Sequence, residues 1–303
     1  MSRPRQRVGD RIFFNATRLA GLLILVALAG VAIFLTTEGL PAFSAPADKL
    51  GGASSFLAYV APLVFGTLLA AALALIIATP LSLGVALVIS HYAPRRLATP
   101  LGYLVDLLAA VPSVVYGLWG LAFLGVRLTP VYGWLDTHVG WIPFFAGPAS
   151  TTGRTILTAA IVLAIMVLPI ITAITREIFV QTPLLNQEAA FALGATRWEM
   201  IRLAVLPYAR SGIVSAVMLG LGRALGETMA VAMVLSASGV VSLNLISDTN
   251  PSTIAANIAL KFPDSTGLAV NALVASGLVL FVITFLVNFA ARSIVARSER
   301  GLA

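Results

Sequence analysis

The sequence predicts an all-α membrane protein, a bundle of six membrane-spanning helices. Its 303 residues are 59% apolar and 10% charged, whereas about 25% of an ordinary soluble domain is charged. The apolar residues occur in runs of the roughly 20 residues that a helix needs to cross a hydrocarbon core of about 30 Å. One compact membrane domain therefore fits the sequence better than several soluble domains.

Windows without charge define the spans. We expect them at Leu19–Thr37, Leu63–Ser90, Leu97–Val126 with a break near Asp106 and Pro112, Thr155–Thr175, Ser211–Leu235 and Leu268–Ala291. The uncharged stretch before the second span exceeds one crossing, so its first part, Ser54–Pro62, is expected to form an interfacial elbow. The predicted organisation is a tail at 1–18, a first span with outer loop and elbow at 19–62, a transmembrane core at 63–291 and a tail at 292–303.

The basic residues give the predicted orientation. Fourteen of the 19 lysines and arginines fall in one set of connections and in the two tails, four fall in the other set, and Arg223 lies inside a span. Because loops rich in Lys and Arg stay in the cytoplasm, both termini are expected to be cytoplasmic. The net charge of +7 is thus a topology signal, and no nucleic-acid partner is expected.

Several kinds of chemistry are not expected from the sequence. There is no cysteine, and the two histidines, His91 and His138, lie in different predicted loops without a carboxylate cluster, so no metal site is predicted. Neither lysine stands in the G-x-x-x-x-G-K-[S/T] context of a phosphate-binding loop. The chain is therefore not expected to be an enzyme alone, and if ATP drives it, another chain hydrolyses the nucleotide.

A polar segment between the fourth and fifth spans, residues 182–207, predicts two short helices outside the bilayer. Thr182 and Pro183 suit the N-cap and first position of a helix, and Gly194 suits the left-handed residue that ends it. Thr196 and Glu199 then form a capping box. Such a rigid pair can dock on a partner protein, although two helices lying on the lipid surface have the same pattern.

The second of these helices has an expected apolar face. Trp198, Ile201 and Val205 are expected along one side, and Pro207 is expected to end the helix. The outer loop between the third and fourth spans, Leu128–Gly153, is rich in aromatic residues. It predicts either an aromatic belt at the membrane interface or a docking surface for an extracytoplasmic partner.

Arg223 and Glu227 are charged residues inside the fifth predicted span. Charge within a span is costly and by default indicates function. Their i, i+4 spacing predicts one helix face and an ion pair, in which Glu227 would hold Arg223 when no oxyanion occupies its donors. The alternative is a self-neutralising pair that only eases insertion. Gly222 and Gly226 predict a surface that another helix approaches closely.

The break in the third span supplies three further candidates for a substrate pathway. Asp106 is interpreted either as a second counter-charge or as an ordinary residue in a wet cavity. Pro112 and Ser113 are expected to free backbone groups that line the path.

The string EAAFALGATRWEMIRLAVLP at residues 188–207 resembles the EAA loop of ABC-importer permeases, with Ala204 where isoleucine is common. The resemblance implies the six-span bundle of the type I ABC importer permease kind, with a cytoplasmic coupling-helix loop between spans four and five. It also implies that this loop docks in a cleft of a separate ATPase, through Glu188, Ala189, Ala190, Gly194, Thr196, Trp198, Glu199, Leu206 and Pro207.

Two further strings, DLLAAVPSVVYG from Asp106 and GRALGETMAV from Gly222, resemble phosphate-specific (Pst) importer permeases, and LGRALGETMAV resembles the PstC type. The resemblance implies a bacterial inner-membrane permease for inorganic phosphate with a PstA-type sister permease, a PstB-type ATPase dimer, a PstS-type binding protein and surrounding lipid. No cofactor is expected on this chain, because ATP and Mg would bind the ATPase. The alternatives are a permease for molybdate, tungstate or sulfate, and a proton-coupled secondary anion transporter.

Overall fold

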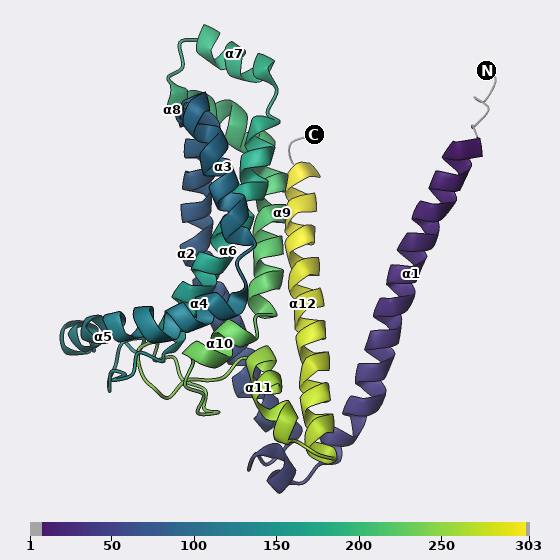
Figure 1. Cartoon of the computed structure of the whole chain (residues 1–303), viewed down its shortest axis with the longest axis vertical. Coiled ribbons are helices and arrows are strands. Elements are labelled where there is room, and N and C mark those ends of the chain that lie inside the picture. The colour runs from purple at the N-terminus through teal and green to yellow at the C-terminus, as the bar shows by residue number, and fades with distance from the viewer. Residues whose placement is uncertain (1–7, 301–303) are drawn as a thin grey trace.

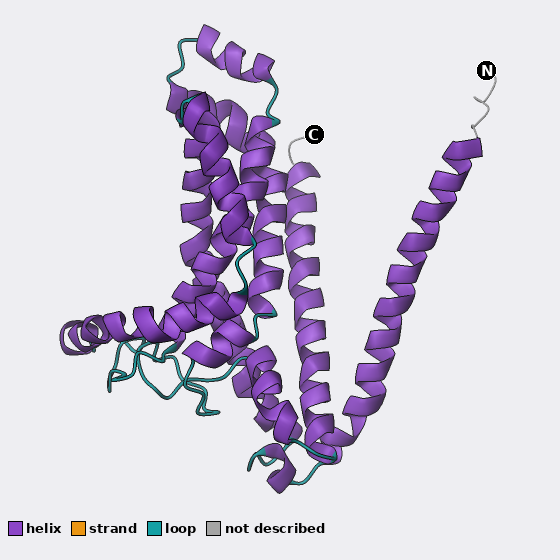
Figure 2. Ribbon diagram, viewed as in Figure 1, coloured by secondary structure: helices purple, strands orange, loops and turns teal. Residues whose placement is uncertain are grey.

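The computed structural model describes residues 8–300, and in them every regular element is a helix (Figures 1 and 2). The α-helices are α1 (Val8–Gly39), α2 (Phe56–Leu87), α3 (Arg95–Ala109), α4 (Ser113–Trp119), α5 (Val126–Val139), α6 (Ile156–Val180), α7 (Leu184–Ala192), α8 (Arg197–Met200), α9 (Leu206–Leu225), α10 (Met229–Val234), α11 (Ile254–Lys261) and α12 (Leu268–Arg300). Short 3₁₀ turns form η1 (Leu40–Ser44), η2 (Ala47–Leu50) and η6 (Phe262–Asp264), and π-helical turns form η3 (Val88–Tyr92), η4 (Gly120–Gly125) and η5 (Ile201–Val205).

Six helical stretches of the described chain are long and apolar enough to cross a membrane. The fourth and sixth agree with the spans predicted at Thr155–Thr175 and Leu268–Ala291, and the first predicted span lies inside α1. Because α1 begins at Val8, residues 8–18 of the predicted tail are helical. The tail residues 1–7 and 301–303 lie outside the described part of the chain.

Helix α6 is the centre of the bundle and packs against α2, α3 and α9. Its N-cap is Thr155, whose hydroxyl accepts a hydrogen bond from the backbone N–H of Thr158. On α2 a row of buried alanines, at 70, 71, 74 and 78, faces this core, so the two helices approach closely, as small residues allow in membrane bundles. Helix α1 stands apart and meets α12 near its own C-terminal end (Figure 1).

The predicted elbow at Ser54–Pro62 was wrong. Ser55 caps α2 by accepting from the N–H of Ala58, and the helix then runs from Phe56 through both Pro62 and Pro80. Proline is tolerated inside a membrane helix, where local adjustments satisfy the freed backbone groups. The excess length of the uncharged stretch therefore lengthens α2 and does not form a separate element.

The third and fifth predicted spans are each divided into two helices, and the break in the third was predicted whereas that in the fifth was not. The third breaks at residues 110–112, and α4, η4 and α5 then run across the bundle, whereas α3 runs along it (Figure 1). The fifth breaks at residues 226–228, so α9 ends at Leu225 and does not continue to Leu235. Pro112, which has no N–H to donate, accounts for the first break, and Gly226, which favours non-helical backbone, accounts for the second.

Two irregular segments, 140–155 and 235–253, lie beside each other next to α5 and α10 (Figure 2). Backbone hydrogen bonds join them, among them Ser150 N to Ile246 O at 2.7 Å and Ser236 N to Arg154 O at 3.2 Å. The first segment is shorter than the predicted loop Leu128–Gly153, because residues 128–139 belong to α5. Tyr132 does not contribute to an aromatic belt, since it is buried and hydrogen-bonded to the Thr158 hydroxyl.

Candidate functional site

The two broken helices meet inside the bundle. Gly117 of α4 lies so close to α10 that a Cβ atom there would be 2.9 Å from the Cα of Ala230. The break between α3 and α4 is thus beside the break between α9 and α10. Broken helices of this kind line substrate sites in many transporters, because their ends supply unpaired backbone groups and partial charges.

All five residues predicted to line a substrate pathway lie at or near these breaks. Asp106 is in the last turn of α3, Pro112 is the N-cap of α4 and Ser113 is its first residue. Arg223 lies in the last turn of α9, and Glu227 lies between α9 and α10. The structure therefore brings two distant sequence segments together, as a shared pathway requires, and leaves the roles of the individual residues as predictions.

The predicted ion pair between Arg223 and Glu227 is absent from the described chain. The i, i+4 argument fails because α9 ends at Leu225, so the two residues do not share a helix. Glu227 instead turns inward, where it is 8% exposed, and one carboxylate oxygen accepts from the N–H of Ala230 at 3.1 Å. It thereby caps α10 from inside the break.

Arg223 is exposed on the surface of the chain. A Cβ atom at the neighbouring Gly222 would meet nothing within 4 Å, so this face of α9 is open. The Tyr116 hydroxyl donates to the carbonyl oxygen of Leu108 at 2.9 Å and ties α4 to the end of α3. Arg223 forms no salt bridge in the described chain, so its donors are available at the end of α9, next to the break between α9 and α10.

The predicted close helix packing at Gly222 and Gly226 is not found within residues 8–300. At Gly226 an added Cβ would meet only the carbonyl oxygen of Gly222, at 3.5 Å. Close approaches occur at other glycines, where the contacting atoms are Ile178 beside Gly212 and Ile171 beside Gly220. The surface around Arg223 is therefore open in the isolated chain.

Asp106 pairs with Arg176, the residue that directly follows the span predicted at Thr155–Thr175. Arg176, near the end of α6, has its Nη2 3.7 Å from Oδ2 of Asp106. A Cβ atom at Gly102 would overlap the Arg176 guanidinium, so the side chain crosses α3 at this glycine. Asp106 thus pairs with Arg176 and not with Arg223, and its two interpretations in the pathway stay predictions. The apolar residues Ile178, Phe179 and Val180 follow Arg176 in the sequence and indicate that the helix continues beyond the charged residue.

The segment 182–207 forms the predicted helix–glycine–helix unit. It lies at the end of the bundle that also holds the N-terminal end of α1 and the C-terminal end of α12 (Figure 1). Gly194 has φ +83°, the left-handed conformation expected of it. The N–H groups of Gly194 and Ala195 bond to the carbonyls of Phe191 and Ala190. The capping box is also confirmed, with Thr196 N 2.7 Å from Oε2 of Glu199.

Three details of this unit differ from the prediction. Helix α7 begins one residue later than expected, with Pro183 as its N-cap, and the buried Thr182 hydroxyl has no hydrogen-bond partner in the described chain. Pro207 does not end the second helix. It lies at the start of α9, directly after the π-helical turn η5, and local π adjustments of this kind accommodate a proline inside a membrane helix.

The expected apolar face of the second helix was wrong in one residue. Ile201 and Val205 are buried against Phe179, whereas Trp198 is 54% exposed. Trp198 and Leu193, which is 90% exposed, instead belong to the outer surface of the unit. Sequence periodicity failed because η5 is a π-helical turn that changes the angular spacing of the side chains.

The predicted docking residues divide into exposed and structural ones. Glu188 and Ala189 are exposed, Ala190 is buried, and Leu206 is half-buried. An open groove of about 490 Å³ lies between α7 and the start of α9, and it is lined by Asn186, Ala189, Ala190, Leu193, Leu203, Ala204, Pro207 and Tyr208. The unit therefore presents a mostly apolar surface held by a glycine turn and a capping box.

Residues 78–302 match the family model described as the inner membrane component of binding-protein-dependent transport systems. The chain belongs to this family. Its six candidate spans agree with a multi-pass inner membrane protein, and the EAA-type segment lies inside the matched residues. In the part of the chain that the structure describes, no group of His, Asp or Glu side chains could hold a metal ion.

Curated relatives of this permease family match nearly the whole chain. The phosphate transport system permease protein PstC 2 of Mycobacterium tuberculosis is 46% identical, over 99% of this chain and 95% of the relative. PstC of Mesorhizobium japonicum is 41% identical, over 96% and 91%. PstC of Xylella fastidiosa (strain Temecula1) is 42% identical, over 90% and 81%.

Solved structures support the fold. A chain of a bacterial ABC transporter involved in alginate import aligns with TM-score 0.53 and 18% identity, covering 94% of this chain and 99% of that one. A chain of the inward-facing MetNI methionine ABC transporter aligns with TM-score 0.51 and 18% identity, covering 78% and 93%. The chain thus has the fold of type I ABC importer permeases.

Proposed function

We propose that this chain is the transmembrane permease subunit of an ATP-driven inorganic phosphate importer. The assignment of phosphate as the substrate rests on the relatives. They are named as phosphate transport permeases and are 41–46% identical over most of the chain. The chain would form half of the translocation pathway with a PstA-type sister permease. A PstS-type binding protein would deliver phosphate from outside, and both termini would be cytoplasmic.

Arg223 is the proposed contact for phosphate in the pathway. Its guanidinium offers a fork of N–H donors to a tetrahedral oxyanion, and it is exposed on an open face of α9. No carboxylate in the described residues pairs with Arg223. Phosphate would therefore bind its N–H groups without first displacing a carboxylate of the chain. The pathway surface would be completed by the sister subunit, which would cover the open face around Gly222.

The exposed unit around α7 and α8 is the proposed coupling element. A PstB-type ATPase dimer, carrying ATP and Mg, would receive Leu193 and Trp198 in a cleft. Because α8, η5 and α9 form one continuous helical run, a displacement of the unit would move the Arg223 end of α9. ATP binding would in this way change the access of the pathway.

Reconstitution tests the proposal. The chain is purified with its sister permease and ATPase, placed in proteoliposomes with the binding protein outside, and assayed for [³²P]phosphate uptake. Uptake is expected only with ATP inside, and Arg223→Gln is expected to abolish it while leaving the complex assembled. Arg127→Gln is the matched control, because Arg127 lies over the Phe123 ring at 3.7 Å, away from the breaks.

Two results would contradict the proposal. Uptake by the chain without an ATPase, driven by a proton gradient, would identify a secondary transporter. Preferential ATP-dependent uptake of molybdate, tungstate or sulfate in competition assays would keep the ABC importer mechanism and replace the substrate.

A further inference from the structure

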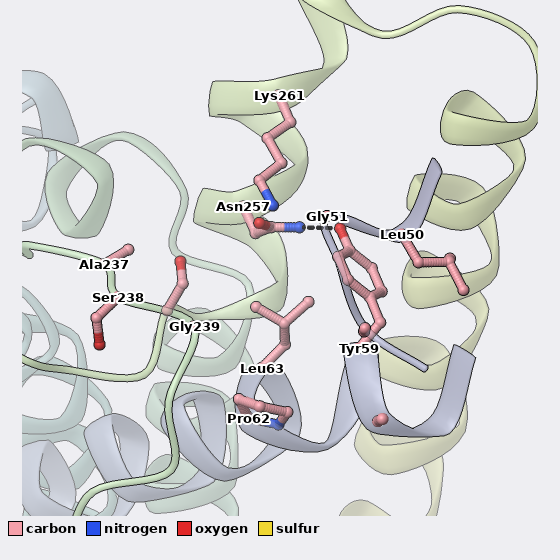
Figure 3. Close-up of a pocket in the computed structure, with 13 residues that line it drawn as sticks. Leu50, Gly51, Tyr59, Pro62, Leu63, Ala237, Ser238, Gly239, Asn257 and Lys261 are labelled. Atoms are coloured by element: carbon pink, nitrogen blue, oxygen red, sulfur yellow. Dashed lines mark hydrogen bonds between the residues drawn. The ribbon is translucent and has the colours of Figure 1, made fainter. Parts of the chain in front are cut away.

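A second cationic feature lies at the end of the bundle opposite α7, and Arg223 is not among the residues that line it. A cavity of about 270 Å³ is enclosed there by η2, the start of α2, the 237–239 loop and α11 (Figure 3). Its polar lining includes Tyr59, Ser238, Ser252, Asn257 and Lys261, and none of its lining residues is acidic. The cavity therefore has a net positive charge.

Lys261 directs its ammonium group into this cavity, toward Asn257 and Tyr59 (Figure 3). The nitrogen lies 5.3 Å from the centre of the Tyr59 ring. No carboxylate oxygen of the described chain lies within 4.0 Å of it. The Lys261 side chain is exposed as a whole, but desolvation lowers the pKa of its ammonium, since no anion replaces the lost water.

The neighbouring groups are arranged as hydrogen-bond donors. The side-chain amide of Asn257 donates to the Tyr59 hydroxyl oxygen at 2.7 Å. The hydroxyl proton of Tyr59 has no acceptor among the described residues, so it remains available to a ligand. An ammonium and a phenol hydroxyl in one cavity are complementary to the oxygens of an anion, and lysine binds phosphate groups as a compact charge.

The size and rim of the cavity specify the ligand further. The volume accommodates a phosphate group with room for a substituent or for water. Leu57, Leu260 and Phe262, adjacent in sequence to lining residues, are exposed apolar side chains, which suit the acyl region of a bilayer. A phosphate group can thus reach the cavity as a lipid headgroup or as the free ion.

We propose that the cavity around Lys261, Tyr59 and Asn257 is a phosphate-group binding site separate from the Arg223 site. Lys261 neutralises the charge of the group, and Tyr59, oriented by Asn257, donates a hydrogen bond to one of its oxygens. The site is independent of the proposed transport cycle, since it forms within this chain and needs neither ATP nor the binding protein.

The test uses the complex with its sister permease and ATPase, carrying Arg223→Gln so that the pathway arginine does not contribute. In one arm, native mass spectrometry counts phosphatidylglycerol molecules retained after purification. In the other, lipid-exchanged complex in neutral detergent is titrated with [³²P]phosphate without ATP. Adding Lys261→Gln is expected to weaken binding on the order of tenfold, the loss of one charge-assisted hydrogen bond, and Lys261→Arg to restore it.

Lys49→Gln is the matched control, because Lys49 is exposed and lies 3.8 Å from Asp48. Loss confined to the lipid arm identifies a headgroup site, and loss confined to the free-ion arm identifies an inorganic phosphate site. Equal binding by the Lys261→Gln and parent complexes in both arms overturns the proposal and leaves Lys261 with only its contact to the Tyr59 ring. Co-purification of all subunits shows that each variant has assembled.

Discussion

Arg176 reaches across α3 to Asp106, with 3.7 Å between its Nη2 and the carboxylate Oδ2. The crossing takes place at Gly102, where any side chain would overlap the guanidinium. The glycine therefore permits the ion pair, and the pair joins α3, which leads into the first helix break, to the central helix α6.

Gly102→Ala is expected to break this pair with little effect on stability. The side chains of Asp106 and Arg176 are 49% and 24% exposed, and such a pair contributes about 1 kcal/mol or less. Alanine in place of glycine within a helix gains roughly 0.5–1 kcal/mol, so the unfolding free energy should change by less than about 1 kcal/mol. Thermal unfolding of the purified complex measures it.

Uptake by the same variant tests the role of Asp106. If Asp106 acts through Arg176, Gly102→Ala and Asp106→Asn should lower phosphate uptake to a similar extent. Gly84→Ala is the control, because a Cβ at that helical glycine meets nothing within 4 Å. Normal uptake by Gly102→Ala together with failure of Asp106→Asn would show that Asp106 works independently of the pair.

Removing the charge of Glu227 is expected to have a smaller effect than removing its side-chain hydrogen-bond acceptor. Because it accepts from the Ala230 N–H, glutamine can keep the cap, whereas Glu227→Ala removes it and should cost about 0.5–2 kcal/mol of stability. Uptake by Glu227→Gln should remain close to that of the parent. Equal loss of uptake in the two variants would mean that the negative charge itself is needed, as the original ion-pair hypothesis required.

The sequence predicted those features that depend on composition or on local backbone rules. Long apolar runs located α6 and α12, a left-handed glycine located the turn at Gly194, and Thr196 with Glu199 located the capping box. What failed depended on where a helix breaks or on contacts between distant segments. The i, i+4 rule assumed an intact helix through Gly226, and a pattern around Arg176 could not reveal that Gly102 leaves space for it on another helix.

Gly194→Val is expected to detach the ATPase. At φ +83° a residue with a Cβ costs roughly 1–2 kcal/mol, and a β-branched one costs more, so the turn between α7 and α8 should rearrange. Co-purification of the ATPase should fall on the order of tenfold, and coupled uptake should fall with it. Gly194→Asn is the matched control, since asparagine adopts the left-handed conformation more readily.

An intact complex with normal ATP-dependent uptake in Gly194→Val would count against the docking role of this unit. The open space around Gly194, where an added Cβ meets nothing within 4 Å, excludes a simple clash inside the chain as the cause of any loss. The comparison with asparagine thus isolates the backbone conformation of the turn.

Gly117→Val is expected to impair the pathway without detaching the ATPase. A Cβ at Gly117 would be 2.9 Å from the Cα of Ala230 and 3.0 Å from the Sδ of Met233, so valine forces α4 and α10 apart. Overpacking of this kind typically costs about 1–3 kcal/mol. Gly133→Val on α5, where added atoms meet open space, is the control.

The two glycine substitutions should therefore separate coupling from transport. Gly194→Val should lose the ATPase from the complex, whereas Gly117→Val should retain it and still fail to move phosphate, because the two helix breaks no longer fit together beside Arg223. Retained uptake in Gly117→Val at the level of Gly133→Val would show that the close contact between α4 and α10 is not needed for the pathway. Loss of the ATPase from Gly117→Val would place the defect in folding of the bundle.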